Sequence, residues 1–312
     1  MDKTIRDLNA LGQSVWYDNV ERGQIVSGEI GNLIHIGISG LTSNPTIFNK
    51  TITGSSDYDE QLKSLLGTDK GPNEIYEAMA IKDIQSVADI LFPVYKGTNG
   101  EDGYASLEVN PQLAQDTSGT VAEARRLFKR LDRPNVMIKV PATPEGIPAI
   151  RQLIGDGINV NITLIFSLLT YRDVRRAYIS GLEDLQKSGG DITRVSSVAS
   201  FFVSRVDTAV DDLLTDGLSG VGQKTEGLFG KAAIANAKLA YRDFCEDFYG
   251  DLFTTLRSKG GRVQRPLWAS TSTKNPEYRD VLYCESLIGS DTVNTMPYPT
   301  IQAFLDHGHV AS

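Results

Sequence analysis

The residue with the clearest chemical potential in this sequence is Lys139, which lies near the end of an apolar run. Four of the five residues from Val136 to Val140 are apolar, and Pro141 ends the run. This pattern predicts a buried parallel strand, and Thr143-Pro144-Glu145 predicts the cap and first turn of the next helix. A lysine at the carboxyl end of such a strand lies where α/β folds place their catalytic groups.

Two interpretations of Lys139 are open from its own strand alone. Most lysines at strand ends run an aliphatic stem past the core and leave the ammonium group in water. In the alternative, burial favours the neutral amine, which is a nucleophile toward a carbonyl carbon. The residue types that meet Lys139 must decide between these interpretations.

The elements that would position Lys139 alternate along the chain between strand and helix patterns. Expected strands cover residues 14–19, 34–40, 104–110, 136–140, 157–167, 194–200, 266–270 and 291–295. Expected helices include 4–11, 21–34 with interruptions at Gly28 and Gly31, and one long helix over 230–258. The apolar residues Ile234, Leu239, Phe244, Phe248 and Leu252 should face the core from that long helix.

Eight strands that are each followed by a helical segment, without consecutive hairpins, predict an α/β fold: a parallel (β/α)8 TIM barrel with extra helices. A doubly wound open sheet is the alternative, but it usually has a glycine-rich first turn. The glycine-rich stretch 217–222 lacks a preceding strand and is expected to be a loop. No linker or close repeat divides the chain, so one domain is expected over residues 1–312.

In a barrel, polar residues at the strand ends should converge on the rim that holds Lys139. Taken singly, each has an ordinary structural explanation as a helix cap, an ion-pair partner or a core residue. Taken together, one amine, two carboxylates and several neutral hydrogen-bonding groups suit Schiff-base chemistry on a sugar. The residues besides Lys139 are Asp18, Asn44, Glu108, Asn161, Thr163 and Ser200.

Composition limits the partners and the compartment. The net charge of −8 disfavours non-specific nucleic-acid binding, although a local basic pocket for phosphate remains possible. Cys245 and Cys284 lack metal or disulfide spacing and are expected to be thiols in a reducing compartment. Three scattered histidines do not predict a zinc site. Without an apolar signal segment or a membrane-length run, a soluble cytoplasmic protein is expected.

Several longer motifs resemble the transaldolase family, specifically its longer bacterial type. They occur in the expected order and span roughly residues 14 to 309. The motifs are LTSNPTIF at 41–48, IKVPAT at 138–143 followed by Gly146-Ile147, GINVNITLIFS at 157–167, SFFVSRVD at 200–207 and LWASTSTKNP at 267–276.

This resemblance implies a role for each matching position. Lys139 would form the Schiff base with the ketose carbonyl, and Asp18 would be the acid/base in carbon–carbon bond cleavage. Glu108 and Thr163 would hold a water that relays protons. The remaining residues would bind substrate: Asn44, Asn161 and Ser200 near the dihydroxyacetone unit, Phe202 as part of the transferase pattern, and Arg205, Ser272 and Lys274 at the phosphate.

The implied protein is a transaldolase of the non-oxidative pentose phosphate pathway, without cofactor or metal, acting on sugar phosphates as a monomer or homodimer. One alternative is a fructose-6-phosphate aldolase that releases free dihydroxyacetone, although such relatives tend to carry Gln where this chain has Glu108. A silent barrel with a binding role is another. Two departures stand out: Lys274 matches a position that is often Arg, and the chain ends soon after Thr295, so the C-terminal helical extension of the family would be short or missing.

Overall fold

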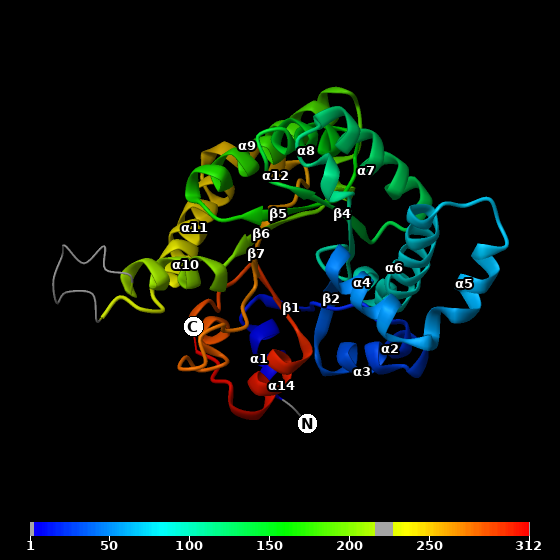
Figure 1. Cartoon of the computed structure of the whole chain (residues 1–312). Coiled ribbons are helices and arrows are strands. Elements are labelled where there is room, and N and C mark those ends of the chain that lie inside the picture. Colours follow the sequence, from blue (N-terminus) through cyan, green and yellow to red (C-terminus); the bar gives the residue numbers. More distant parts are fainter. Residues whose placement is uncertain (1–2, 216–226, 312) are drawn as a thin grey trace.

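A computed structural model describes residues 3–215 and 227–311 of the chain, so the glycine-rich stretch 217–222 lies outside the described residues. Eight parallel strands form a closed barrel in which each strand pairs with the next and β8 pairs with β1 (Figure 1). The predicted eight-stranded α/β barrel is therefore confirmed. The strands are β1 (Gln13–Tyr17), β2 (Ile38–Thr42), β3 (Ala105–Glu108), β4 (Val136–Pro141), β5 (Val160–Ile165), β6 (Ser197–Phe202), β7 (Arg265–Ala269) and β8 (Thr292–Met296).

Helices surround the barrel, and α1 and α14 from opposite ends of the chain lie side by side (Figure 1). The first half contains α1 (Lys3–Ala10), α2 (Arg22–Ser27), α3 (Glu29–Ile36), α4 (Pro45–Gly54), α5 (Asp59–Leu66), α6 (Pro72–Gly97) and α7 (Thr117–Leu131). The second half contains α8 (Gly146–Gly155), α9 (Leu168–Lys187), α10 (Ser204–Thr215), α11 (Ala232–Tyr249), α12 (Asp251–Ser258), α13 (Leu282–Ser286) and α14 (Tyr298–His307). Short 3-10 helices cover Ser56–Tyr58, Pro111–Leu113 and Ile192–Arg194.

The second strand begins later than the sequence predicts. Residues 34–36 belong to α3, and Gly37 ends that helix with φ 116° while its N–H bonds to the carbonyls of Leu33 and Ile34. Glycine adopts this left-handed conformation without steric cost, which allows the chain to turn into β2 at Ile38. Gly28 separates α2 from α3 as predicted, whereas Gly31 lies within α3 and interrupts nothing.

The long helix predicted over 230–258 is two helices, α11 and α12, that meet at Gly250. A Cβ atom at Gly250 would lie 2.3 Å from the carbonyl oxygen of Glu246, so the close turn needs glycine. Because the helical phase changes there, Leu252 is 57% exposed. Leu239 lies off the buried face of α11, which carries Ala237, Ala240 and Phe244, and is 40% exposed. The prediction that both face the core is wrong. Phe244 and Phe248 are buried as predicted, and Ile234 packs against the core.

Two apolar clusters build the barrel. The larger lies between the strands and the helices, and the smaller fills the barrel interior. Gly40 makes room for the interior cluster, because a Cβ atom there would lie 2.4 Å from the indole of Trp16. The interior cluster contains Trp16, Tyr104, Met137, Val198, Leu267, Ala269 and Val293. The barrel is therefore a packed core that holds the strand ends in fixed positions.

Candidate active site

Lys139 lies on β4 between the two neighbouring strands that carry its predicted partners. In the strand register it is opposite Glu108 of β3 and Asn161 of β5. The residue is only 8% exposed. Its Nζ donates a hydrogen bond to the carbonyl oxygen of Ser43 at 2.9 Å and lies 3.3 Å from Oε2 of Glu108. The amine is therefore held in one position, with a proton acceptor beside it.

Glu108 ends β3, and its side chain is 15% exposed. A cavity of about 350 Å³ adjoins it outside the strands and is lined by residues of α4, α6 and α7. Tyr76 of α6 shares this cavity, and burial together with the charge of Glu108 raises its pKa to about 12. Tyr76 therefore lines the same cavity as Glu108 and lies within the electrostatic field of its carboxylate.

Asp18 follows β1 directly and is partly buried. Its N–H donates to the carbonyl oxygen of Met296 at 2.9 Å, which fixes the backbone against β8. The hydroxyl of Thr42 donates to Oδ1 of Asp18 at 2.7 Å and lies 2.7 Å from the hydroxyl of Thr295. Asp18 is therefore oriented by the neighbouring strands β2 and β8. The N-cap position of α2 is Glu21, so Asp18 does not cap that helix.

A buried polar chain crosses three strands next to Lys139. The amide of Asn161 donates to the hydroxyl of Ser106 at 3.2 Å, and the hydroxyl of Ser200 donates to Oδ1 of Asn161 at 2.7 Å. Thr163 is 2% exposed and lies in register with Pro141, two residues beyond Asn161 on β5. Side chains two residues apart in a strand point to the same face, so Asn161 and Thr163 both face the barrel interior.

Asn44 caps a helix and also lies at the rim of the barrel. It is the N-cap of α4, and its Oδ1 accepts a hydrogen bond from the N–H of Ile47 at 2.9 Å. Asn44 is therefore both a helix cap and a residue of the rim. Because Oδ1 is engaged, the amide Nδ2 is the group of Asn44 that remains to donate to a ligand.

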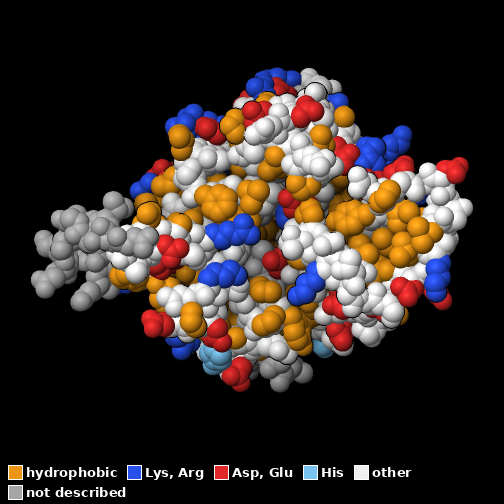
Figure 2. All heavy atoms as spheres, viewed as in Figure 1, with side chains coloured by type: hydrophobic (Ala, Val, Ile, Leu, Met, Phe, Trp, Pro, Cys, Tyr) orange, Lys and Arg blue, Asp and Glu red, His pale blue; other side chains and the backbone are white. Residues whose placement is uncertain are grey.

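The predicted phosphate residues come from α10 and the loop after β7, and Phe202 of β6 lies beside one of them. Phe202 ends β6, and its ring lies 5.1 Å from that of Phe166 and 5.0 Å from the guanidinium of Arg205. Arg205 is exposed on α10. The ammonium of Lys274, also exposed, donates to the hydroxyl of Ser272 at 3.1 Å. Figure 2 shows a hollow on one face of the molecule with Lys and Arg side chains beside it and acidic side chains within it.

Sequence reasoning missed four polar residues that complete this site. Ser43 supplies the carbonyl that holds Lys139, and Ser106 joins the Asn161 chain. Thr42 and Thr295 orient Asp18. Two of them carry a signal in the sequence, because Ser106 precedes Glu108 by two residues and Thr42 precedes Asn44 by two at the end of a strand. A carbonyl contact such as that of Ser43 leaves no sequence signal.

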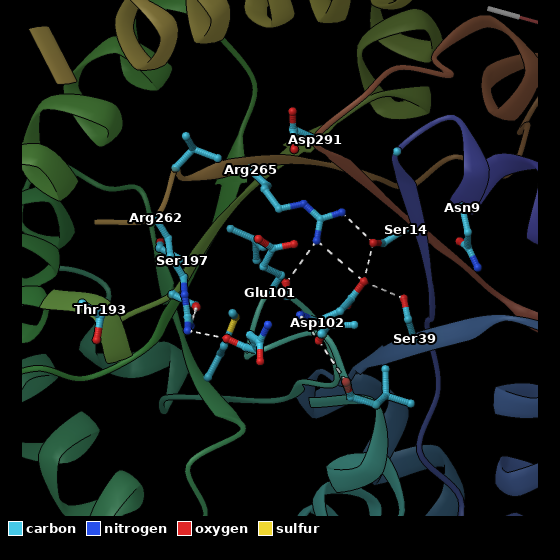
Figure 3. Close-up of a pocket in the computed structure, with 18 of the residues that line it drawn as sticks. Asn9, Ser14, Ser39, Glu101, Asp102, Thr193, Ser197, Arg262, Arg265 and Asp291 are labelled. Carbon is cyan, nitrogen blue, oxygen red and sulfur yellow. Dashed lines mark hydrogen bonds and ion pairs between the residues drawn. The ribbon is translucent and has the colours of Figure 1, made fainter. Parts of the chain in front are cut away.

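A larger cavity, of about 850 Å³, lies at the opposite end of the barrel, where the strands begin (Figure 3). Arg265 and Asp102 point toward one another there, with Nη1 of Arg265 3.7 Å from Oδ2 of Asp102. Arg262 donates to the carbonyls of Gly100 at 2.7 Å and Asn99 at 2.6 Å. We call Ser14, Ser39, Asp102, Arg262 and Arg265 the amino-end network. Its charged groups are bound to the protein itself, which favours a structural role over a catalytic one.

The described residues contain neither a group of side chains suited to a metal ion nor a helix suited to crossing a membrane. Within 3–215 and 227–311, the side chains of His, Cys, Asp and Glu form no group of three that could hold a metal ion. No helix of that part of the chain has the length and apolar character needed to cross a membrane. Cys245 and Cys284 are free thiols, as predicted.

Comparison with known proteins gives a consistent result. The family model described as transaldolase/fructose-6-phosphate aldolase matches residues 15–312. A protein of Trichodesmium erythraeum named transaldolase is 48% identical over 307 residues, covering 96% of this chain and 81% of the relative. A transaldolase of Saccharopolyspora erythraea is 47% identical over 310 residues, with 99% and 83% covered. Transaldolase 1 of Streptomyces coelicolor is 49% identical over 300 residues, with 96% and 78% covered.

Proposed function

We propose that this protein is a transaldolase, and the premise is its family: the chain belongs to the transaldolase/fructose-6-phosphate aldolase family. The reaction moves a dihydroxyacetone unit from a ketose phosphate, sedoheptulose 7-phosphate or fructose 6-phosphate, to an aldose phosphate, glyceraldehyde 3-phosphate or erythrose 4-phosphate. The observation that carries the assignment is the buried amine of Lys139, held beside Glu108 and facing a set of hydrogen-bonding groups.

Lys139 acts as the nucleophile. Its neutral amine adds to the ketose carbonyl, and loss of water leaves an imine. Asp18 then removes the proton of the hydroxyl beside the breaking carbon–carbon bond. The bonding electrons pass into the imine, so the three-carbon unit remains on Lys139 as an enamine while the first aldose phosphate leaves. The enamine carbon attacks the second aldehyde, Asp18 returns its proton to the new hydroxyl, and hydrolysis of the imine releases the new ketose.

The other groups divide the remaining work. Glu108 and Thr163 hold the water that is released in imine formation and consumed in hydrolysis, and Glu108 lies close enough to Nζ to accept its proton. Asn44, Asn161 and Ser200 bind hydroxyls of the dihydroxyacetone unit. Arg205, Ser272 and Lys274 bind the phosphate, and the ring of Phe202 packs against the guanidinium of Arg205. Cations at one edge of the rim explain how a chain of net charge −8 binds anionic sugars.

The test is an assay with fructose 6-phosphate as donor and erythrose 4-phosphate as acceptor, with identification of the products. A transaldolase forms sedoheptulose 7-phosphate and glyceraldehyde 3-phosphate. Free dihydroxyacetone in place of the seven-carbon ketose would instead indicate the aldolase activity, and no turnover would indicate a silent barrel. The control is Lys139→Arg, which keeps the charge and removes the imine-forming amine.

We further propose that residues 1–312 form one domain, that the protein acts in the cytoplasm in the non-oxidative pentose phosphate pathway, and that it is a monomer or homodimer. Light scattering of the purified chain measures the oligomeric state directly.

A further inference from the structure

The two proposed phosphate cations lie on different elements, Arg205 on α10 and Lys274 on the loop after β7. The start of that loop is fixed to α10, because the N–H of Ser204 donates to the carbonyl of Ser270 at 3.0 Å. The hydroxyls of the same two serines are 2.8 Å apart. Ser270 adopts the left-handed conformation with φ 58°, which turns the chain away from β7. Lys274 lies farther along the loop, beyond these contacts.

A second contact joins the same two elements on the other side of Lys274. The hydroxyl of Tyr278 donates to Oδ2 of Asp211 at 2.6 Å, and Oδ1 of Asp211 accepts from the N–H of Gly230 at 3.2 Å. Burial and the hydrogen bond to Asp211 raise the pKa of Tyr278 to about 12, so the hydroxyl remains a donor at neutral pH. We call the Asp211–Tyr278 pair the latch.

The segment between Lys274 and the latch is short and turned back on itself. Oδ1 of Asn275 accepts from the N–H of Glu277 at 3.0 Å, and the carbonyl of Asn275 accepts from the N–H of Tyr278 at 3.2 Å. Lys274 is therefore followed at once by a tight turn whose far end is tied to α10. Although a lysine stem is long and flexible, a fixed backbone limits the space that the ammonium can reach and lowers the entropy lost when the ammonium binds a ligand.

We propose that the latch positions Lys274 so that it shares one phosphate with Arg205, and thereby sets the preference for phosphorylated over unphosphorylated ketoses. This inference rests on the proposed function and deepens it. Asp211 and Tyr278 are positioning residues that act through Lys274 and do not touch the sugar.

The chain offers a matched control for the latch at the other end of the barrel. The hydroxyl of Tyr249 on α11 donates to Oδ2 of Asp291 at 2.5 Å, in the turn before β8. Tyr249→Phe removes the same kind of hydrogen bond from the same residue type, far from the strand ends that carry Lys139. It should therefore change stability alone.

The experiment compares the wild type with Tyr278→Phe, Asp211→Asn and Tyr249→Phe. Calorimetric titration with inorganic phosphate gives the anion affinity. Borohydride trapping at increasing concentrations of fructose 6-phosphate or dihydroxyacetone gives the half-saturating concentration of each. Tyr278→Phe should weaken phosphate and fructose 6-phosphate binding about three- to tenfold, the range expected for one misplaced charge-assisted contact, and change dihydroxyacetone less than about twofold.

A double-mutant cycle shows whether the latch acts through Lys274. In a Lys274→Ala background, the effect of Tyr278→Phe on phosphate affinity should fall below about twofold, because the group being positioned is gone. An equal effect in both backgrounds, or equal losses for fructose 6-phosphate and dihydroxyacetone, would overturn the proposal. Asp211→Asn keeps the size of the side chain and can still pair with Tyr278, so it should lose less phosphate affinity than Tyr278→Phe. If Tyr278→Phe unfolds, Asp211→Asn takes its place in the comparison.

The outcomes for the latch and for the proposed function are separable. If fructose 6-phosphate forms no adduct on the wild-type protein, the proposed function fails, while the phosphate titrations still judge the latch. If the wild type is trapped normally and Tyr278→Phe shows no loss of phosphate affinity, the latch alone fails.

Discussion

The two ends of the barrel both hold buried charged groups, yet they use them differently. At the amino end, Asp102 accepts hydrogen bonds from the indole of Trp16 at 2.6 Å and from the hydroxyl of Ser39 at 2.8 Å. It accepts a further bond from the hydroxyl of Ser14. At the carboxyl end, Asp18 accepts one hydrogen bond from the described residues, from Thr42 at 2.7 Å. One carboxylate is occupied by the protein, and the other keeps acceptor positions for a substrate.

The arginines at the two ends differ in the same way, because one is bound to the protein and the other is exposed. The guanidinium of Arg262 donates hydrogen bonds to two backbone carbonyls and, at 2.7 Å, to the hydroxyl of Ser196. Arg205 is exposed and faces the ring of Phe202. Cavity size is therefore a poor guide to function in this molecule, because the larger cavity lies at the end where the charges are already paired. The convergence of Glu108, Asn161 and Ser43 on the buried amine of Lys139 is the better indicator.

The largest expected effect is at Lys139. Borohydride with fructose 6-phosphate should trap an adduct on Lys139 in the wild type, and Lys139→Arg should abolish both trapping and turnover, because a guanidinium cannot form the imine. Mass spectrometry of the digested protein locates the adduct. An adduct on any other lysine would sink the mechanism, and circular dichroism of the variant checks that it is folded.

Next in size is Asp18→Ala, which should lower turnover by about 10²–10⁴-fold, the scale of a positioned acid/base group. The Schiff base with fructose 6-phosphate should still form and then stall before cleavage. Weighing the borohydride-trapped protein should therefore reveal a six-carbon adduct. A three-carbon adduct formed at the wild-type rate would contradict the assignment of Asp18 as cleavage base.

A smaller effect is expected at the phosphate edge. Arg205→Ala should raise the KM for phosphorylated donors by about tenfold to a hundredfold, since a charge-assisted hydrogen bond contributes roughly 1.5–3 kcal/mol. Unphosphorylated dihydroxyacetone should be affected much less. Steady-state kinetics with both donors makes the comparison, and equal losses would assign Arg205 to support of the fold instead.

The smallest effect on catalysis is expected from Asp102→Asn in the amino-end network. The serine hydroxyls donate to Oδ2 of Asp102 and the indole of Trp16 donates to Oδ1, whereas an amide offers one acceptor oxygen. At least one of these hydrogen bonds is therefore lost, and the free energy of unfolding should fall by about 1–3 kcal/mol. Turnover should remain within about twofold of the wild type, because the site at the carboxyl end is intact. Urea unfolding and steady-state kinetics measure the two quantities. A tenfold loss of turnover at unchanged stability would show that the amino-end network contributes to catalysis. It would contradict the assignment of a purely structural role to that end of the barrel.

The sequence by itself determined the order of the elements and the rim of the barrel at which the proposed site residues meet. Alternation of apolar runs with helical patterns predicted the eight strands, and the carboxyl ends of parallel strands in one barrel must share a rim. That reasoning placed Lys139, Glu108 and Asn161 on one edge, where the strand register puts them side by side. The helix ends at Gly37 and Gly250 are not predictable from the sequence alone, because a left-handed cap or a sharp break depends on what the backbone meets.

Only the tertiary structure decided the contacts between residues far apart in the chain. The carbonyl of Ser43 reaches Lys139 across 96 positions, and Thr42 meets Thr295 across 253 positions. The second contact exists because β8 closes against β1, which brings β2 and β8 to either side of Asp18. Neither a backbone carbonyl nor a threonine pair carries a recognisable spacing, because their partners are selected by barrel closure and packing. The sequence therefore named the proposed site residues, while the closed barrel determined what holds each one in place.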